Sequence, residues 1–171
     1  MLVAGLQGQG KTKFVEGLMQ GQPNVILINC FEDDFKTLNA PRIVHQDDIL
    51  KFFNKLLKER PKQQCFIVID ELLTLCDNKD INKALRSVLA ICRHYNWTII
   101  GISQRCEKTE LPFKNLFLYR VCFRMIEESS YRTVLGFNRD AVIDRELKPR
   151  EFIYATEEIG VGTTYDVGKE E

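Results

Sequence analysis

The sequence predicts an α/β protein in which a mostly parallel central sheet is covered by helices on both faces. Three observations support this fold class: short apolar runs of strand length recur along the chain, segments with helical periodicity separate them, and turn-forming residues lie between the two. The 171 residues match the usual size of one domain, about 100–200 residues. We therefore expect a single domain over residues 1–171, with the acidic tail 166–171 as a candidate for disorder.

Composition and charge exclude several classes of protein. Hydrophobic residues make up 44% and charged residues 28%, as in ordinary globular proteins, which excludes a disordered or collagen-like chain. Lys and Arg balance Asp and Glu at 24 each, so bulk charge favours no particular partner. No apolar run approaches the ~18 residues of a membrane helix. The six cysteines lack zinc-ligand spacing and are expected to be reduced thiols, which predicts a cytoplasmic location.

The first part of the chain alternates between strand and helix signals. Leu2–Ala4 is a short apolar strand that runs into a glycine-rich turn, and a helix is predicted over Thr12–Gln20. Val25–Asn29 is a continuous apolar run, typical of a strand covered on both faces. Asp47 and Asp48 are expected N-caps of the next helix. The apolar face of that helix consists of Ile49, Leu50, Phe52, Phe53, Leu56 and Leu57.

Two further buried strands are predicted in the middle of the chain. Cys65–Asp70 is an apolar run that ends in an acid, and Trp97–Ser103 is the second run. The helix between them begins near Asp80 and has one apolar face, made of Ile81, Leu85, Val88, Cys92 and Tyr95. Ligands of open α/β sheets bind beyond the carboxyl ends of the strands, so we expect the chemistry there.

The remaining elements are shorter. A strand is predicted over Arg120–Met125, and Ser129 is an expected cap of a helix that continues to Leu135. Glu151–Tyr154 and Thr163–Tyr165 are predicted as short terminal strands.

Residues 5–12, GLQGQGKT, match the phosphate-loop pattern G-x-x-x-x-G-K-[ST] in full. Glycines let such a loop turn its N–H groups towards phosphates, Lys11 adds charge for the β- and γ-phosphates, and the Thr12 hydroxyl can bind Mg²⁺. A chance glycine-rich turn is the alternative, but the flanking strand and helix favour a P-loop. The residues expected to bind ATP are Gly5, Gln7, Gly8, Gln9, Gly10, Lys11, Thr12 and Lys13.

Asp70 and Glu71 follow the apolar strand that comes third in the chain. Taken alone, they could be two exposed acids at a strand end. With a phosphate loop upstream, Asp70 is expected to hold Mg²⁺, and Glu71 to activate the water that attacks the γ-phosphate. A hydrolase needs such a glutamate, whereas a small-molecule kinase does not. Since Val25–Asn29 lies between the loop and the acid strand in sequence, we predict a three-layer ASCE/RecA-like P-loop ATPase whose acid strand is not beside the loop strand.

Further candidates for γ-phosphate chemistry follow the acid strand. Gln104, at the tip of the strand Trp97–Ser103, either senses the γ-phosphate or is a polar strand cap. Three arginines are candidates for a finger offered to the nucleotide of a neighbouring subunit, or else are ordinary surface residues: Arg120, Arg124 and Arg132.

Several segments also resemble the FtsK–HerA superfamily of DNA-pumping ATPases. Residues 98–105 are similar to its "TQR" sensor stretch, 119–123 to its "TRIAF" strand, 130–135 to its "DSRTIL" run, and 147–154 to its closing "L-x-x-G-x-M-L-Y" strand. Arg150 stands where that family usually has Gly. Only four residues precede the first loop glycine, so either the chain starts late or an edge of the usual core is missing.

The resemblance implies a ring, most often a hexamer, around double-stranded DNA. It implies Gln104 as the sensor, with Arg120 as first and Arg132 as second choice for the trans-acting finger. The small size is similar to the genome-packaging ATPases of viruses with an internal membrane. This implies a capsid or membrane-protein docking partner, in the host cytoplasm or the virion. Two alternatives stay open: an initiator- or helicase-loader-like ATPase, and a non-hydrolysing subunit that binds nucleotide only to assemble.

Overall fold

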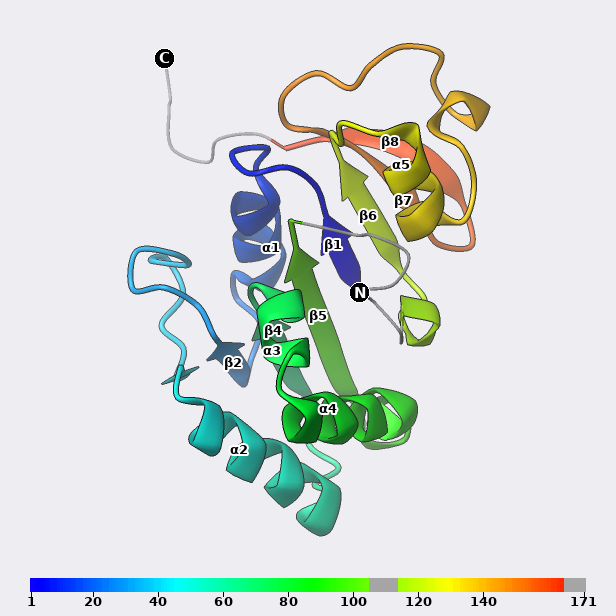
Figure 1. Ribbon diagram of the computed structural model, residues 1–171. Coiled ribbons are helices and arrows are strands. Elements are labelled where there is room, and N and C mark those ends of the chain that lie inside the picture. The colour runs from blue at the N-terminus through cyan, green and yellow to red at the C-terminus, as the bar shows by residue number, and fades with distance from the viewer. Residues whose placement is uncertain (105–113, 165–171) are drawn as a thin grey trace.

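The computed structural model describes residues 1–104 and 114–164, and an eight-stranded sheet runs through its centre (Figure 1). The order of the strands is β3-β2-β4-β5-β1-β6-β7-β8. All neighbours from β3 to β6 are parallel, and the last two pairs are antiparallel. The strand bounds are β1 Leu2–Ala4, β2 Val25–Ile28, β3 Arg42–Ile43, β4 Cys65–Ile69, β5 Trp97–Ser103, β6 Arg120–Phe123, β7 Glu151–Ala155 and β8 Ile159–Thr163.

The α/β fold class predicted from the sequence is confirmed, and the helices cover the two faces unequally. Helix α1 packs on one face, together with the segment that contains Phe35, while the other helices pack on the opposite face. Those helices bury Phe53, Leu85 and Tyr131 among the inward residues of the sheet. The helix bounds are α1 Lys11–Met19, α2 Gln46–Glu59, α3 Leu72–Cys76, α4 Lys79–Ile91 and α5 Glu128–Leu135.

The strand order confirms that the acid strand is not beside the loop strand, because β5 lies between β1 and β4. Val3 is in register with Ile102 on β5, and Val68 of β4 is in register with Ile100. All three strands run parallel, so their carboxyl ends share one edge of the sheet. The phosphate loop, the acid pair and the residue after β5 therefore lie along the same edge.

Strand β1 has three residues, yet it lies in the middle of the sheet between β5 and β6. Its residues Leu2, Val3 and Ala4 are all completely buried. Its short length thus does not mark an edge of the sheet: β1 pairs on both sides, and its apolar side chains are covered on both faces.

Some local predictions were wrong in detail. Asp47 and Asp48 lie in the first turn of α2, whose N-cap is His45, and Ser129 lies inside α5, whose N-cap is Glu127. Acids in a first turn still interact favourably with the helix dipole, so the sequence signal was real but displaced. Strand β8 begins at Ile159 instead of near Thr163, because it pairs with β7 through a short reversal.

Two short elements were missed, β3 and α3. Two residues give β3 no periodicity to detect, and only its pairing with β2 defines it. Helix α3 has five residues, LLTLC, directly after the acid pair. Its Leu72 and Leu75 are buried, so tertiary packing, and not propensity, forms this single turn.

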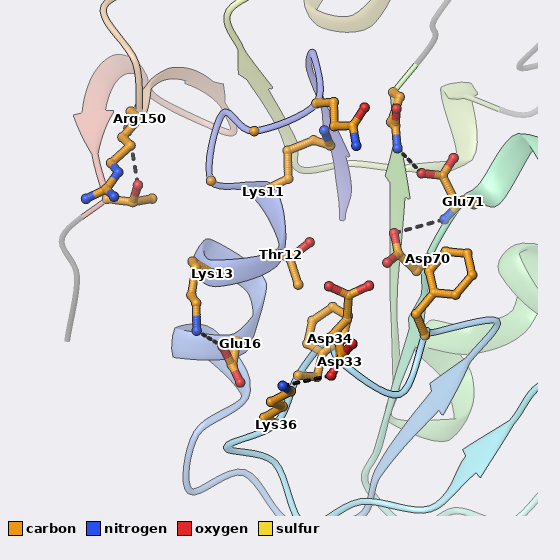
Figure 2. Close-up of a pocket in the computed structure, with 17 residues that line it drawn as sticks. Lys11, Thr12, Lys13, Glu16, Asp33, Asp34, Lys36, Asp70, Glu71 and Arg150 are labelled. Atoms are coloured by element: carbon orange, nitrogen blue, oxygen red, sulfur yellow. Dashed lines mark hydrogen bonds and ion pairs between the residues drawn. The ribbon is translucent and has the colours of Figure 1, made fainter. Parts of the chain in front are cut away.

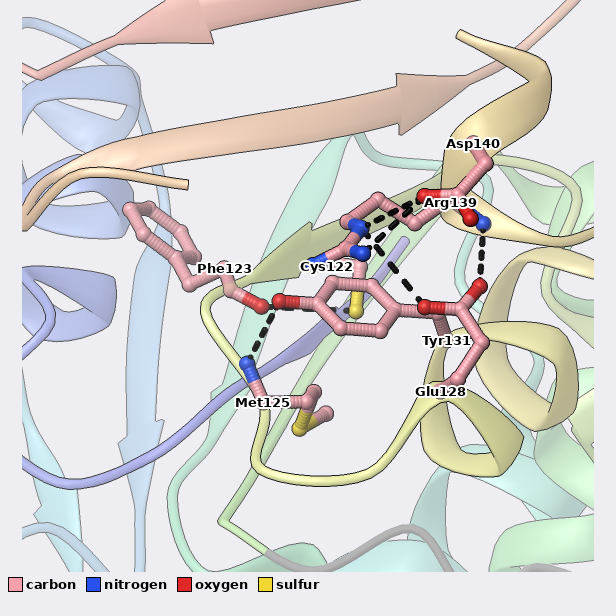
Figure 3. A network of polar contacts seen from close by, with 7 residues as sticks. All are labelled: Cys122, Phe123, Met125, Glu128, Tyr131, Arg139 and Asp140. Carbon is pink, nitrogen blue, oxygen red and sulfur yellow. Dashed lines mark hydrogen bonds and ion pairs between the residues drawn. The ribbon is translucent and has the colours of Figure 1, made fainter. Parts of the chain in front are cut away.

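A network of polar contacts attaches α5 to the end of β6 (Figure 3). The backbone N–H of Met125 donates to the Tyr131 hydroxyl at 2.8 Å, and the Arg139 guanidinium lies 5.6 Å from the centre of the Tyr131 ring. The N–H of Arg139 donates to the Glu128 carboxylate at 2.6 Å. The segment that follows β6 also contacts the phosphate loop, because the carbonyl of Arg124 accepts from Leu6 N at 3.0 Å. Tyr131, in the region similar to the family's "DSRTIL" run, thus bonds to the segment after β6 that also contacts the phosphate loop.

Candidate nucleotide-binding site

Glycines shape the phosphate loop at positions where space or backbone angle disfavours other residues. A Cβ on Gly5 would lie 2.6 Å from the Cβ of Phe123, closer than real side chains approach. Gly10 is the N-cap of α1 with a φ of 96°, a left-handed conformation that favours glycine. Among the residues that the structure describes, no side chain caps this helix end. The N-terminal end of a helix favours an anion, as in other phosphate loops.

A cleft of about 580 Å³ opens over the phosphate loop (Figure 2). Its lining includes most of the residues predicted to bind nucleotide, whereas Gly5 and Gln9 do not line it. The Gln9 Oε1 atom is buried without a hydrogen-bond partner in the described residues. The predicted residues that line the cleft are Gln7, Gly8, Gly10, Lys11, Thr12, Lys13, Asp70, Glu71 and Gln104.

Lys11 lies at the centre of the loop and is almost completely buried. Its Nζ donates to the carbonyl of Gly5 at 2.7 Å and to that of Leu6 at 2.8 Å. These carbonyls belong to the loop itself, so the ammonium group is held within the turn that would surround a phosphate. A point charge in this position suits the β- and γ-phosphates of a nucleotide.

The acid pair and Gln104 lie together at the carboxyl ends of β4 and β5. The Asp70 Oδ1 atom accepts from the N–H of Glu71 at 3.0 Å, and the Asp70 carbonyl accepts from Asn29 Nδ2 at 3.1 Å. Gln104 Nε2 donates a hydrogen bond to Glu71 Oε1. Glu71 has a φ of 48°, a conformation uncommon for residues with a side chain. The strained backbone of Glu71 and the hydrogen bond from Gln104 thus set the orientation of its carboxylate.

The surroundings of Asp70 disfavour the ionised form of its carboxyl group. Burial first, and then the negative charges of Glu71 and Asp34, raise its pKa to about 6, although the Glu71 N–H bond and Lys11 act in the opposite direction. A dication would offset both the burial and the like charges. Oxygen ligands from Thr12 and Asp70, with phosphate and water as the rest, are the set that Mg²⁺ prefers, so these residues fit the ion.

Replacing Asp70 by Asn should stabilise the metal-free protein at pH 8 by about 2–3 kcal/mol. The folded-state pKa of about 6 lies above the ordinary value of 3.8, so the ionised carboxylate disfavours folding above pH 6. As the pH falls from 6 towards 4 the folded protein takes up the proton, and at pH 4.5 the advantage of the variant should be less than half of that at pH 8. Urea unfolding at pH 8 and pH 4.5 measures the free energy of unfolding of the variant and of the unmodified protein at each pH. Asp77→Asn, at an exposed position outside the cleft, is the control, and equal stabilities at pH 8 would contradict the prediction.

The three candidate finger arginines do not line the cleft. Arg120 begins β6, at the end of the strand opposite to the phosphate loop, and donates to the carbonyls of Phe117 at 3.3 Å and Val134 at 3.2 Å. Arg124 pairs with Glu146 at 2.8 Å. Arg132 is exposed on α5. A role of any of them as a trans-acting finger stays a prediction. Arg105 of the predicted sensor stretch and the tail 166–171 lie outside the described residues.

Sequence reasoning missed several residues of the cleft. The segment after β2 contributes Asp33 and Asp34, and the turn before β7 contributes Arg150. Glu16 of α1 pairs with Lys13 at 3.0 Å and accepts from the N–H of Thr37, which ties that segment to α1. Asp33 and Asp34 follow β2, which borders the acid strand β4, and this position in the sequence could have pointed to them. The other lining residues missed are Phe31, Phe35, Lys36 and Thr164.

Phosphate loop, acid strand and an intervening strand with a polar tip together define a P-loop ATPase. The chain belongs to the ATPase family associated with various cellular activities (AAA), whose family profile matches residues 1–125. Among curated proteins, none matches the chain significantly. In the described part of the chain, no helix is long and apolar enough to cross a bilayer.

Solved structures add particular relatives. The pCW3 conjugation coupling protein TcpA, solved with ATPγS, superposes with a TM-score of 0.77 at 17% identity, covering 95% of this chain and 59% of TcpA. The type VII secretion ATPase EccC of Thermomonospora curvata gives 0.74 at 20% identity, covering 99% and 26%. The chain thus spans little more than half of TcpA and about a quarter of EccC.

The genome packaging NTPase B204 of Sulfolobus turreted icosahedral virus 2, in complex with ATPγS, gives a TM-score of 0.69 at 14% identity. Here the match covers 96% of both chains. At these identities the neighbours show that the chain shares their fold.

Proposed function

We propose that this ATPase is a motor that moves double-stranded DNA, and that it packages viral DNA into a capsid. The observation that carries the hydrolytic part is the Glu71 carboxylate, which lines the cleft with Lys11 and accepts a hydrogen bond from Gln104. A carboxylate held in this way suits a water-activating base. The match with B204, which covers 96% of both chains, supports packaging.

In this proposal Lys11 and the loop N–H groups hold the β- and γ-phosphates. Glu71 takes a proton from water as the water oxygen bonds to the γ-phosphorus, and the bond to the bridging oxygen breaks to leave ADP and phosphate. Gln104 orients Glu71 and senses whether the γ-phosphate is present. Mg²⁺, held by Thr12 and Asp70, would supply positive charge to the phosphate oxygens.

The motor acts as a ring, with a hexamer as the first expectation, because a hydrolysis site completed by a neighbour links turnover to assembly. Arg120 is proposed as the residue offered across the subunit boundary, with Arg132 as the second choice. The partners are double-stranded DNA and a docking protein of the capsid or viral membrane, in the host cytoplasm or the virion.

Long duplex DNA should raise the steady-state ATPase rate several-fold, and the same sample should contain a ring when its mass is measured. A pump is expected to hydrolyse faster when its track is bound, and a subunit that lacks a neighbour's finger should be slow, since such a finger is worth ~10³–10⁵ in rate. Lys11→Ala controls for contaminating ATPases. Turnover that is unaffected by DNA but rises with a partner protein would contradict the motor and favour a loader.

A further inference from the structure

The turn before β7 carries an arginine into the nucleotide cleft. Arg150 lines the cleft together with Lys13 and Thr164. Figure 2 shows Arg150 on the side of the phosphate loop away from Asp70 and Glu71. It therefore lies at the opposite end of the cleft from Asp70 and Glu71, the acids proposed to hold a metal and to activate water.

Hydrogen bonds hold the turn before β7 in one conformation. The Arg145 guanidinium donates to both Glu151 oxygens, at 2.6 and 2.9 Å, and the N–H of Lys148 donates to the same carboxylate at 2.8 Å. The pair with Arg145 holds the pKa of Glu151 at about 2, so the contact persists at all physiological pH values. Paired guanidinium–carboxylate contacts of this kind are specific in geometry. Arg150, next to Glu151, is thus presented by a preorganised turn.

The backbone of Arg150 is in the left-handed region, with a φ of 70°. Glycine adopts this conformation readily, whereas a residue with a Cβ is strained there. Glycine is also what the sequence resemblance leads one to expect here. The chain therefore keeps the glycine-like turn while adding a long cationic side chain, and strained residues of this kind concentrate at ligand sites.

The side chain packs against the phosphate loop itself. A Cβ built on Gly10 would lie 3.7 Å from the Cγ of Arg150 and 3.1 Å from the hydroxyl oxygen of Thr164. Thr164 is held in turn, because its N–H donates to the Arg150 carbonyl at 3.0 Å. In a phosphate loop the N–H groups of this region surround the α- and β-phosphates, while the lysine reaches the β- and γ-phosphates.

We infer that Arg150 is a nucleotide-binding residue of this chain's own cleft, which contacts the α-phosphate end of ATP and ADP. A guanidinium fork can donate two hydrogen bonds to one phosphate, and it would help to balance the carboxylates of the cleft. Because Arg150 is remote from Glu71, it binds substrate and product alike and does not take part in the hydrolysis step. The inference rests on the nucleotide site and not on DNA translocation.

Arg150→Gly should weaken binding of both ADP and ATPγS by about tenfold, as expected for loss of a charge-assisted contact. It should raise KM for ATP by a similar factor and leave kcat within about twofold. Arg150→Lys should bind more tightly than the Gly variant but more weakly than the unmodified protein, because an ammonium group keeps the charge without the fork. Calorimetry without DNA measures the affinities, and competition by AMP should weaken in parallel.

The Gly variant also removes the backbone strain, so its Tm should be equal to or above that of the unmodified protein, which separates lost contact from lost folding. Lys148→Ala is the matched control, since it removes a positive charge from the same turn but not from the cleft lining. Unchanged ADP affinity in Arg150→Gly would overturn the inference, as would a loss confined to ATPγS, or an equal loss in the control. Lower DNA affinity with unchanged ADP affinity would instead assign Arg150 a role in binding DNA and overturn the inference. Failure of DNA stimulation would leave these results standing, so the two proposals fail separately.

Discussion

Glu71→Gln protein should bind ATP about as tightly as the unmodified protein and lose turnover by about 100-fold or more. General-base catalysis contributes ~10²–10⁴ in rate, and an amide cannot take a proton from water. The substitution keeps the size and planarity of the side chain, so its contact with Gln104 can survive through the amide oxygen. Calorimetry with ATPγS gives the affinity, and a steady-state phosphate-release assay gives the rate.

The control for this experiment is Asp77→Asn, an equally small carboxylate-to-amide change at an exposed position outside the cleft. It should leave both affinity and turnover unchanged. Steady-state turnover that survives in Glu71→Gln would show that another group activates the water, and the role assigned to Glu71 would be lost.

Subunits with Arg120→Ala and subunits with Lys11→Ala should each be nearly inactive alone and recover measurable ATPase activity when mixed. In a ring with shared sites, some boundaries would join an intact phosphate loop to an intact finger. The expected deficit of Arg120→Ala alone is ~10³–10⁵ if it supplies transition-state charge in trans. The measurement is turnover as a function of mixing ratio at constant total protein.

Arg120 also has a structural contact, since it donates to the carbonyls of Phe117 and Val134. Thermal unfolding and ATPγS affinity of Arg120→Ala separate this contribution, because a finger that acts in trans should change neither strongly. The same mixing experiment is repeated with Arg132→Ala, at an exposed position on α5, in place of Arg120→Ala. Rescue with Arg132→Ala but at no ratio with Arg120→Ala would move the role of the finger to Arg132.

Much of the fold could be predicted because its signals are local. The run Cys65–Ile69 is apolar throughout, as a strand buried on both faces must be, and α4 repeats its apolar residues every three or four positions. The caps of α2 and α5 were misplaced by two or three residues, since several polar residues near each start could serve. Helix α3 had no signal at all, because its single turn depends on burying Leu72 and Leu75.

The candidate site divides in the same way. Lys11 and Thr12 stand in a contiguous pattern, and Asp70 and Glu71 end an unmistakable strand, so each could be recognised within a few residues of sequence. Arg150 showed only as a departure from an expected glycine. Its presence in the cleft depends on the antiparallel strands β7 and β8, which return the end of the described chain to the phosphate loop.

The sequence by itself determined the kind of chemistry, a phosphate loop with a metal-binding acid and a candidate base, because those groups lie in short motifs whose strands and helix are encoded beside them. Only the tertiary structure decided which distant side chains share the cleft: that Gln104 bonds to Glu71, that Asp34 faces the acid pair, and that Arg150 packs against Gly10. Such contacts follow from strand order and register. Both are set by the burial of the whole sheet between its two helical layers, and no local stretch of the chain carries that information.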